Sequence, residues 1–181
     1  MELFSGILIL ICAALFGITM KIADLLNEHG LKLFKGSAIL FGILWGLFGA
    51  LLALSNNTIA VLMLAMNIAF IIRNRLDYLN HQIAASIIII GFLFTSVFDP
   101  ILFIAFFIIF LAFGSLKDFV DDKLKKKNGA LFKLNESMLY YPIPTFLYSL
   151  FYGNWIVFGA FTAFTISYDL TKYFAAKKGY N

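Results

Sequence analysis

The fold of this chain is decided by residues 83–116, which read IAASIIIIGFLFTSVFDPILFIAFFIIFLAFGSL. The stretch holds a single charged residue, Asp99, and is longer than the roughly 20 residues with which a helix crosses a bilayer. Pro100 disfavours helix at the residue before it and suits the first turn of the helix that follows. We therefore expect Asp99-Pro100 to divide the run into two membrane-spanning helices joined by a tight turn.

The composition of the whole chain is typical of a membrane protein. Of its 181 residues, 62% are hydrophobic and 13% are charged, whereas a soluble domain is about half apolar and about a quarter charged. The single cysteine, Cys12, excludes a disulfide framework and a thiolate metal site. Cationic loops on one side of the membrane explain the net charge of +4, and we expect no nucleic-acid partner.

The gaps between the apolar segments are of two alternating kinds. One kind is basic, and the other is a tight turn without Lys or Arg, as at Ser55–Thr58, Asp99-Pro100 and Gly153-Asn154. Because Lys and Arg are retained on the cytoplasmic face, the alternation predicts an all-α bundle of about seven transmembrane helices in the cell membrane. The N-terminus is then outside, and the C-terminus and all Lys and Arg are cytoplasmic. A bundle of five spans with one or two re-entrant turns is the structural alternative. The seven expected spans are Leu3–Met20, Ser37–Leu54, Ile59–Ile72, Ile83–Phe98, Ile101–Leu116, Met138–Tyr152 and Trp155–Leu170.

We expect one domain over residues 1–181, with a weak parallel repeat of about 3–80 and 83–175. In each copy a span ends in an acidic segment, which is followed by basic residues and a hairpin of two spans. An odd number of spans precedes each acidic segment, so both segments face the same compartment, unlike those of an inverted-repeat transporter. Ionisable residues deep in the membrane would indicate a transporter or channel, and the interiors of the expected spans contain none.

A stripe of small residues runs along the second expected span. Gly42, Gly46 and Ala50 recur every fourth residue, so they lie on one face of a helix. We expect another helix to approach closely along that face.

Two clusters of carboxylates lie where helices leave the membrane. Asp24 and Glu28 are four residues apart, and Asp118, Asp121 and Asp122 have i, i+3 and i+4 spacing. Each cluster therefore lies on one face of a continuing helix. Like charges at this spacing repel one another, so a cation should neutralise each cluster.

Two kinds of cation fit this pattern. The first is lysine, because Lys21, Lys117 and Lys123 adjoin the clusters and could form salt bridges with them in solvated loops. The second is Mg²⁺, which prefers oxygen ligands and is typically held by a few carboxylates together with substrate phosphates. Two such clusters facing each other across a cleft would hold a diphosphate through bridging metal ions, while neighbouring Lys or Arg stabilises the departing diphosphate.

The segments around the clusters are similar to two motifs of a known family. Residues 106–122, FFIIFLAFGSLKDFVDD, run from an apolar span into K-D-x-x-D, and residues 20–28, MKIADLLNE, align with N-D-x-x-D-x-x-x-D. Residues 31–36, LKLFKG, are similar to the R-P-L-P-x-G that follows the first motif. On these motifs the chain resembles the UbiA-type intramembrane prenyltransferases, as a short, degenerate member. Met20-Lys21 replaces the Asn-Asp pair of the first motif, and Lys125 takes the last acidic position of the second.

The resemblance implies a membrane transferase of lipid biosynthesis that moves a polyprenyl group from a prenyl diphosphate to a hydrophobic acceptor, with Mg²⁺ as cofactor. A lipid acceptor and a quinone-type aromatic acceptor are equally open. The alternative is a catalytically inactive relative that acts as an intramembrane lipid-binding or assembly protein, which the lysines at family acidic positions favour. The resemblance assigns catalysis to Asp24, Asp118 and Asp121, metal ligation to Asp24, Glu28, Asp118, Asp121 and Asp122, and diphosphate binding to Lys21, Lys35, Arg73 and Lys117.

Overall fold

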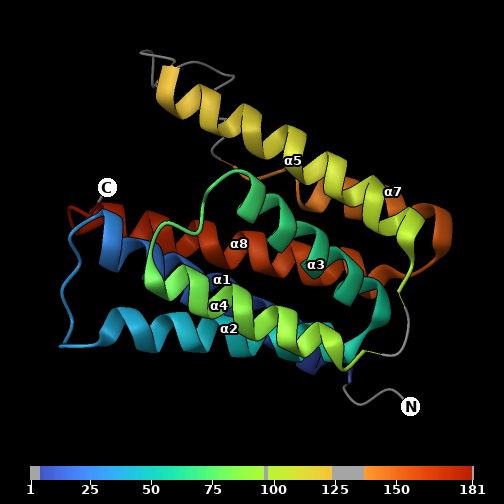
Figure 1. Ribbon diagram of the computed structural model, residues 1–181, viewed down its shortest axis with the longest axis horizontal. Coiled ribbons are helices and arrows are strands. Elements are labelled where there is room, and N and C mark those ends of the chain that lie inside the picture. The colour runs from blue at the N-terminus through green and yellow to red at the C-terminus, as the bar shows by residue number, and fades with distance from the viewer. Residues whose placement is uncertain (1–4, 96–97, 124–136, 181) are drawn as a thin grey trace.

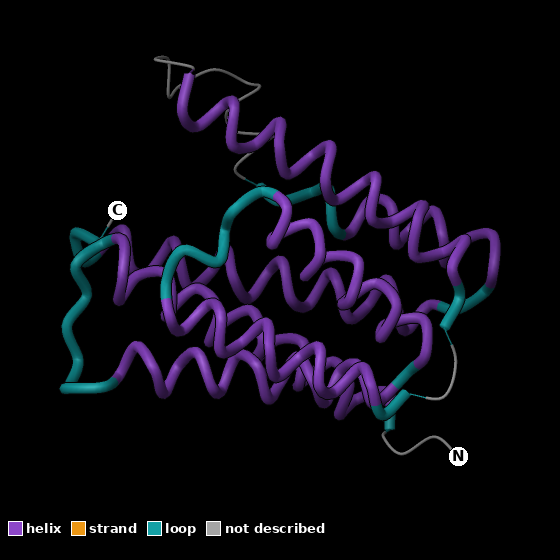
Figure 2. Tube along the Cα trace, in the orientation of Figure 1, coloured by secondary structure: helices purple, strands orange, loops and turns teal. Residues whose placement is uncertain are grey.

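The computed structural model describes residues 5–95, 98–123 and 137–180, with the side chains of all of these except 121–123. Within these ranges the chain is all-helical (Figure 1, Figure 2), as predicted. The helices are α1 (Gly6–Glu28), α2 (Ser37–Ser55), α3 (Asn57–Ile72), α4 (Leu79–Leu93), α5 (Pro100–Lys123), α7 (Pro142–Tyr152) and α8 (Trp155–Lys177).

Short polar residues determine where α3 and α5 begin. The Oδ1 atom of Asn56 accepts hydrogen bonds from the backbone N–H groups of Thr58 (2.9 Å) and Ile59 (3.2 Å), so α3 starts directly after α2 ends. The Oδ1 atom of Asp99 likewise accepts from the N–H groups of Ile101 and Leu102, both at 3.0 Å. Pro100 is the first residue of α5, a position at which its missing N–H costs nothing. The predicted division of the apolar run at Asp99-Pro100 is confirmed.

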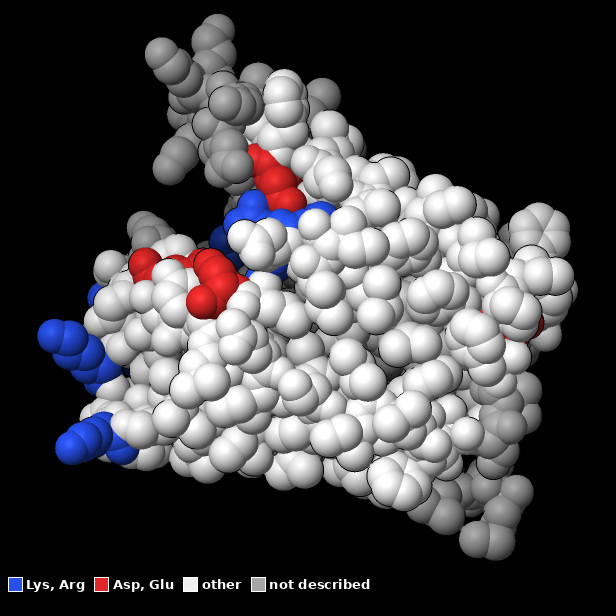
Figure 3. Space-filling view, viewed as in Figure 1, with Lys and Arg blue, Asp and Glu red and all other residues white. Residues whose placement is uncertain are grey.

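The bundle has two ends of different character. Helices α2, α4 and α7 end near the points where α3, α5 and α8 begin, at one end of the bundle, and α1, α3, α5 and α8 end at the other (Figure 1). Most of the Lys, Arg, Asp and Glu side chains visible in Figure 3 lie at this second end. We call it the charged end, formed by the last turns of α1, α5 and α8, the segment 73–78 and the first turn of α4.

Small residues bring α2 against α4, as predicted. A Cβ atom added at Gly46 would lie 3.0 Å from the Cα atom of Ala84. On α4, a Cβ atom added at Gly91 would lie 2.6 Å from the Cβ atom of Ala50. Larger side chains along this contact would push the two backbones apart.

Helix α1 packs as closely on α8. A Cβ atom added at Gly17 would lie 2.4 Å from the backbone carbonyl oxygen of Phe164. The core beside this contact is largely aromatic, and the rings of Phe16 and Phe164 meet edge to face with their centroids 5.1 Å apart. The fully buried Tyr141 continues the cluster toward the charged end, with its ring 5.2 Å from that of Phe164.

Among the residues that the structure describes, three helices are long and apolar enough to cross a membrane, namely α1, α2 and residues 100–120 of α5. Helices α3 and α4 are apolar but shorter. Large apolar side chains such as Ile101 and Phe151 are about four-fifths exposed on the outside of the bundle, at 81% and 80%. A continuous surface of this kind suits contact with lipid better than contact with water. The structure therefore supports a membrane-associated helical bundle.

Several expected spans have different limits in the structure. The fourth was expected over Ile83–Phe98, but α4 begins at Leu79 and ends at Leu93. The fifth and seventh were expected to end at Leu116 and Leu170, but α5 continues to Lys123 and α8 to Lys177.

The first span was expected to end at Met20, but its helix continues to Glu28 and carries the acidic segment with it. The sixth was expected over Met138–Tyr152, but α7 begins only at Pro142. Proline lacks an N–H donor and is tolerated in the first turn of a helix and not in its interior, so Pro142 and Pro144 mark the start of α7.

Candidate functional site at the charged end

The two acidic segments named from the sequence both lie at the charged end. Asp24 and Glu28 occupy the last turns of α1, and Asp118 lies near the end of α5. In Figure 3, Lys and Arg side chains lie between two groups of Asp and Glu side chains. The side chains of Asp121 and Asp122 lie outside the described part of the structure, so the roles assigned to them stay predictions.

Asp24 joins three helices through its carboxylate. The hydroxyl of Tyr168 on α8 donates a hydrogen bond of 2.8 Å to Oδ2. The Nζ atom of Lys21, one turn earlier on α1, lies 4.0 Å from the same oxygen and 5.2 Å from the centre of the Tyr168 ring. On the other side, the Nε2 atom of His81 on α4 lies 3.4 Å from Oδ1. Lysine pairing of this cluster is thus confirmed for Asp24, although Lys21 is buried and not in a solvated loop.

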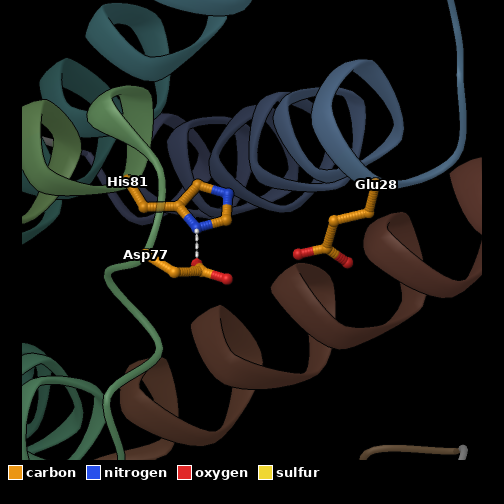
Figure 4. A group of neighbouring side chains, drawn as sticks. All are labelled: Glu28, Asp77 and His81. Carbon is orange, nitrogen blue, oxygen red and sulfur yellow. Dashed lines mark ion pairs between the residues drawn. The ribbon is translucent and has the colours of Figure 1, made fainter.

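His81 lies beside a second carboxylate. Its Nδ1 atom is 3.4 Å from Oδ1 of Asp77, one turn earlier (Figure 4). The imidazole is held edge to face against the rings of Trp45 and Tyr78, with centroids 5.5 and 5.4 Å away. His81 precedes the apolar run that starts at position 83. Burial favours its neutral form, but the charges of Asp24 and Asp77 outweigh burial, and the pKa of His81 is raised.

Glu28 lies beside Asp77 and His81 as well as on the same face of α1 as Asp24. One oxygen of Glu28, one oxygen of Asp77 and one nitrogen of His81 all lie within 4.8 Å of one another. Figure 4 shows both carboxylates pointing toward the imidazole. We call these three residues the His81 cluster; its two carboxylates are exposed and its histidine is buried.

A buried asparagine positions the His81 cluster. Oδ1 of Asn80 accepts a hydrogen bond of 2.5 Å from Nδ2 of Asn27, which ties the first turn of α4 to α1. The same oxygen accepts from the backbone N–H of His81 at 3.1 Å. A Cβ atom added at Gly42 of α2 would lie 2.6 Å from the carbonyl oxygen of Asn80, so α2 supports this turn from the far side.

Asp118 is neutralised by arginine, which the sequence analysis did not predict. The guanidinium of Arg73 donates to both of its oxygens, from Nε to Oδ2 at 2.9 Å and from Nη2 to Oδ1 at 2.8 Å. Arg75 also donates to Oδ1. The Arg73 side chain is only 7% exposed and lies against the backbone of Gly114 on α5. Arg73, expected to bind diphosphate, and Asp118, expected to bind a metal, therefore bind each other.

This pairing bears directly on the predicted Mg²⁺ site. Mg²⁺ takes oxygen ligands at about 2.0–2.1 Å, and both oxygens of Asp118 already accept hydrogen bonds from guanidinium groups. Asp24 is similarly engaged by Tyr168 and His81. In this arrangement Asp118 cannot ligate Mg²⁺ unless another anion replaces it as the hydrogen-bond partner of Arg73 and Arg75.

Two further lysines were expected to bind diphosphate. Lys117 is half-buried on α5, within electrostatic range of Tyr140 and Asp169. Lys35 is exposed in the connection between α1 and α2, and the described residues show no contact between it and the rest of the site.

Two functional side chains were missed. Arg75 lies in the basic gap between the third and fourth expected spans, and its position in that gap does not show which of the cations there pairs with Asp118. Tyr168 lies one residue before an acidic position on α8, and no local signal in the sequence connects it with Asp24.

Tyr140 and Tyr141 lie between the two acidic segments. Their ring centroids are 4.4 Å apart. Tyr141 is within electrostatic range of both Arg73, the partner of Asp118, and Asp24. The two acidic segments thus act on the same pair of tyrosines, although nearly a hundred residues separate them along the chain.

Comparisons with models of known families, with curated proteins and with solved structures found no match. The family resemblance drawn from the two acidic motifs therefore stays a prediction.

Proposed function

We propose that this chain is a membrane prenyltransferase that binds a prenyl diphosphate at the charged end and transfers the prenyl group to a hydrophobic acceptor. One observation carries the proposal: two acidic segments and a group of cations gather at the same end of an apolar bundle. A diphosphate needs several cations, and its prenyl tail needs apolar surroundings directly beside them. The cations of the charged end that support the proposal are Lys21, Arg73, Arg75 and Lys117.

Aromatic side chains lead from the charged end into the bundle. Tyr168, which donates to Asp24, lies against Phe164 with ring centroids 6.4 Å apart. Phe164 also lines a small apolar pocket of about 10 Å³, which is about the size of one water molecule, so an isoprenoid tail would enter there only if the surrounding side chains moved apart. The pocket is also lined by Phe16, Leu52, Ile59, Met63 and Phe161.

Arg73 and Arg75 would bind the phosphate groups. Guanidinium groups bind carboxylates and phosphates with the same bidentate geometry. A diphosphate that replaces Asp118 on these arginines keeps both of them paired. The released carboxylate then has free oxygens of the kind that Mg²⁺ binds together with substrate phosphates.

The reaction is the heterolysis of an allylic C–O bond. The electron pair leaves with the diphosphate, and the cations of the charged end stabilise the charge that develops on it. Mg²⁺, when bound, supplies further neutralisation of the leaving group. The acceptor forms the new bond to the allylic carbon and loses a proton. Faces of nearby aromatic rings attract the cationic carbon.

The orientation of the chain is part of the same proposal. Because Lys and Arg are retained in the cytoplasm, the charged end faces the cytoplasm, with about seven crossings and the N-terminus outside. The diphosphate would then be drawn from the cytoplasmic leaflet.

Titration of the purified protein with geranylgeranyl diphosphate, with and without Mg²⁺, tests the proposal. We expect binding that requires Mg²⁺ and that is weakened by Asp118→Asn or Asp24→Asn. Arg75→Gln should weaken binding too, because it removes a phosphate ligand that is itself largely exposed. Lys178→Gln, which removes an exposed cation beyond α8, is the matched control and should bind normally. Binding that ignores all of these changes, or no binding, would contradict the proposal.

A second candidate function is a non-catalytic lipid-binding or assembly protein. The observation that favours it is the pairing of Asp118 with Arg73 and Arg75, which leaves that carboxylate without a free oxygen. This candidate predicts that the protein binds prenyl diphosphate equally well with and without Mg²⁺ and transfers nothing to any acceptor.

A further inference from the structure

The His81 cluster contains the donor atoms of a metal site. Its three ligand atoms come from the end of α1, the segment before α4 and the first turn of α4, and they lie within 4.8 Å of one another. Ligands of one divalent ion lie about 3–4 Å apart when each is about 2.1 Å from the metal. The carboxylates are the mobile members, since the side chains of Glu28 and Asp77 are 42% and 50% exposed. Small rotations of these two side chains would complete the geometry around a fixed imidazole.

The histidine itself is unsatisfied. Its side chain is 6% exposed, and its buried Nε2 atom has no hydrogen-bond partner. Oδ1 of Asp24 is 3.4 Å away, a contact between charges and not an aligned hydrogen bond. Protein groups alone therefore leave this imidazole incomplete.

The surrounding charge is negative. Three carboxylates, those of Asp24, Glu28 and Asp77, surround one imidazole. Lys21 lies 4.0 Å from Asp24, and His29 lies 3.9 Å from Glu28. A divalent cation at the cluster would offset the repulsion among the carboxylates.

We propose that Glu28, Asp77 and His81 bind a divalent transition-metal ion, of the Zn²⁺ or Mn²⁺ class. One imidazole nitrogen with carboxylate oxygens favours such ions over Mg²⁺, which prefers oxygen alone. The nitrogen that faces Asp77 is Nδ1, so Nδ1 would ligate the ion, and Nε2 would then face the carboxylate of Asp24. That arrangement orients metal-binding histidines in proteins. The site shares Glu28 with the metal ligands that the family resemblance assigns, but Asp77 and His81 are not among those ligands, and metal binding here requires no prenyl diphosphate.

The test is a titration of the full-length, chelator-treated protein with Mn²⁺ alone, in the absence of any diphosphate. Free Mn²⁺ gives a six-line electron paramagnetic resonance signal that is lost on binding, so the titration yields stoichiometry and affinity. We expect one ion per chain, displaced by Zn²⁺ at far lower concentrations than by Mg²⁺. His81→Gln and Asp77→Asn should each weaken binding by more than about 10-fold. His29→Gln changes the other histidine of the chain, which lies 3.9 Å from Glu28 without being a proposed ligand, and should weaken binding far less than His81→Gln.

A second measurement uses the wild-type residues at the site, so it remains informative even if His81→Gln or Asp77→Asn fails to fold. Protein labelled with ¹⁵N-histidine and loaded with Mn²⁺ should show hyperfine coupling to ¹⁵N in pulsed resonance spectra, and the coupling should persist in His29→Gln. Absence of the coupling, or affinity that is unchanged in His81→Gln, would overturn the proposal. Because the titration contains no diphosphate, a failure to bind Mn²⁺ would not contradict the binding of prenyl diphosphate. A failure to bind prenyl diphosphate would likewise not contradict the binding of Mn²⁺.

Discussion

Replacing Gly114 with alanine should separate Arg73 from Asp118. A Cβ atom at position 114 would lie 2.1 Å from Nη1, 2.4 Å from Cζ and 2.8 Å from Nε of Arg73. All three distances are shorter than van der Waals contact, so the guanidinium, which is the far end of a flexible side chain, has to shift away from α5. It then loses its two hydrogen bonds to the carboxylate, at 2.8 and 2.9 Å.

Two opposing effects determine the size of the change. Breaking a buried ion pair destabilises a protein by at least about 3 kcal/mol. We use this lower limit because Arg75 still pairs with Asp118 after Arg73 has moved. Alanine is favoured over glycine inside a helix by about 1 kcal/mol. The net loss of unfolding free energy is therefore about 2 kcal/mol. For a chain of this size it corresponds to a fall of about 4–8 °C in the unfolding temperature.

Unfolding in detergent micelles, followed by the fluorescence of Trp45 and Trp155, measures this loss. Gly159→Ala is the matched control, because its Cβ atom meets only the tip of Leu10, at 3.1 Å. The decisive comparison is Gly114→Ala in an Arg73→Ala background, where the clash is gone and the alanine should stabilise the protein by about 1 kcal/mol. The reasoning is refuted if Gly114→Ala has the same effect in both backgrounds.

Two further predictions concern the contacts of α8. Gly17→Ala should destabilise the protein by about 3 kcal/mol, the upper end of the usual range for overpacking. The added Cβ atom would lie 2.4 Å from the backbone oxygen of Phe164, which cannot rotate away. An unfolding curve equal to that of the wild type in the same assay would contradict this prediction. Tyr168→Phe removes the 2.8 Å hydrogen bond to Asp24 and should cost about 2 kcal/mol, as expected for a bond to a charged group. Tyr173→Phe, at an exposed position of the same helix, should cost nothing measurable, and an equal loss in both variants would argue against the Asp24 contact.

The helices, and the positions at which α3, α5 and α8 begin, could be predicted to within two residues because their causes are local. Every backbone N–H and C=O group in a bilayer needs a partner within the protein, which makes a long apolar run helical wherever it lies. Asp99-Pro100 contains its own capping group and its own helix start, so residues 83–116 divide there without help from distant parts of the chain. The close approach of another helix to the small residues of α2 was also predictable, although only the structure shows that this helix is α4.

The partners of the charged side chains were not predictable in the same way. Spacing placed Asp118 at the end of a helix, but it could not show that Arg73 would lie across from it or that Glu28 would turn toward Asp77 and His81. The energy of a charge depends steeply on distance and on burial. Those quantities are set by which helices adjoin and how closely, and they follow from packing between segments far apart in the chain. The sequence alone therefore predicts that two acidic segments lie at the ends of helices. The tertiary structure decides whether each carboxylate pairs with arginine, tyrosine or histidine, because those partners come from segments far apart in the chain.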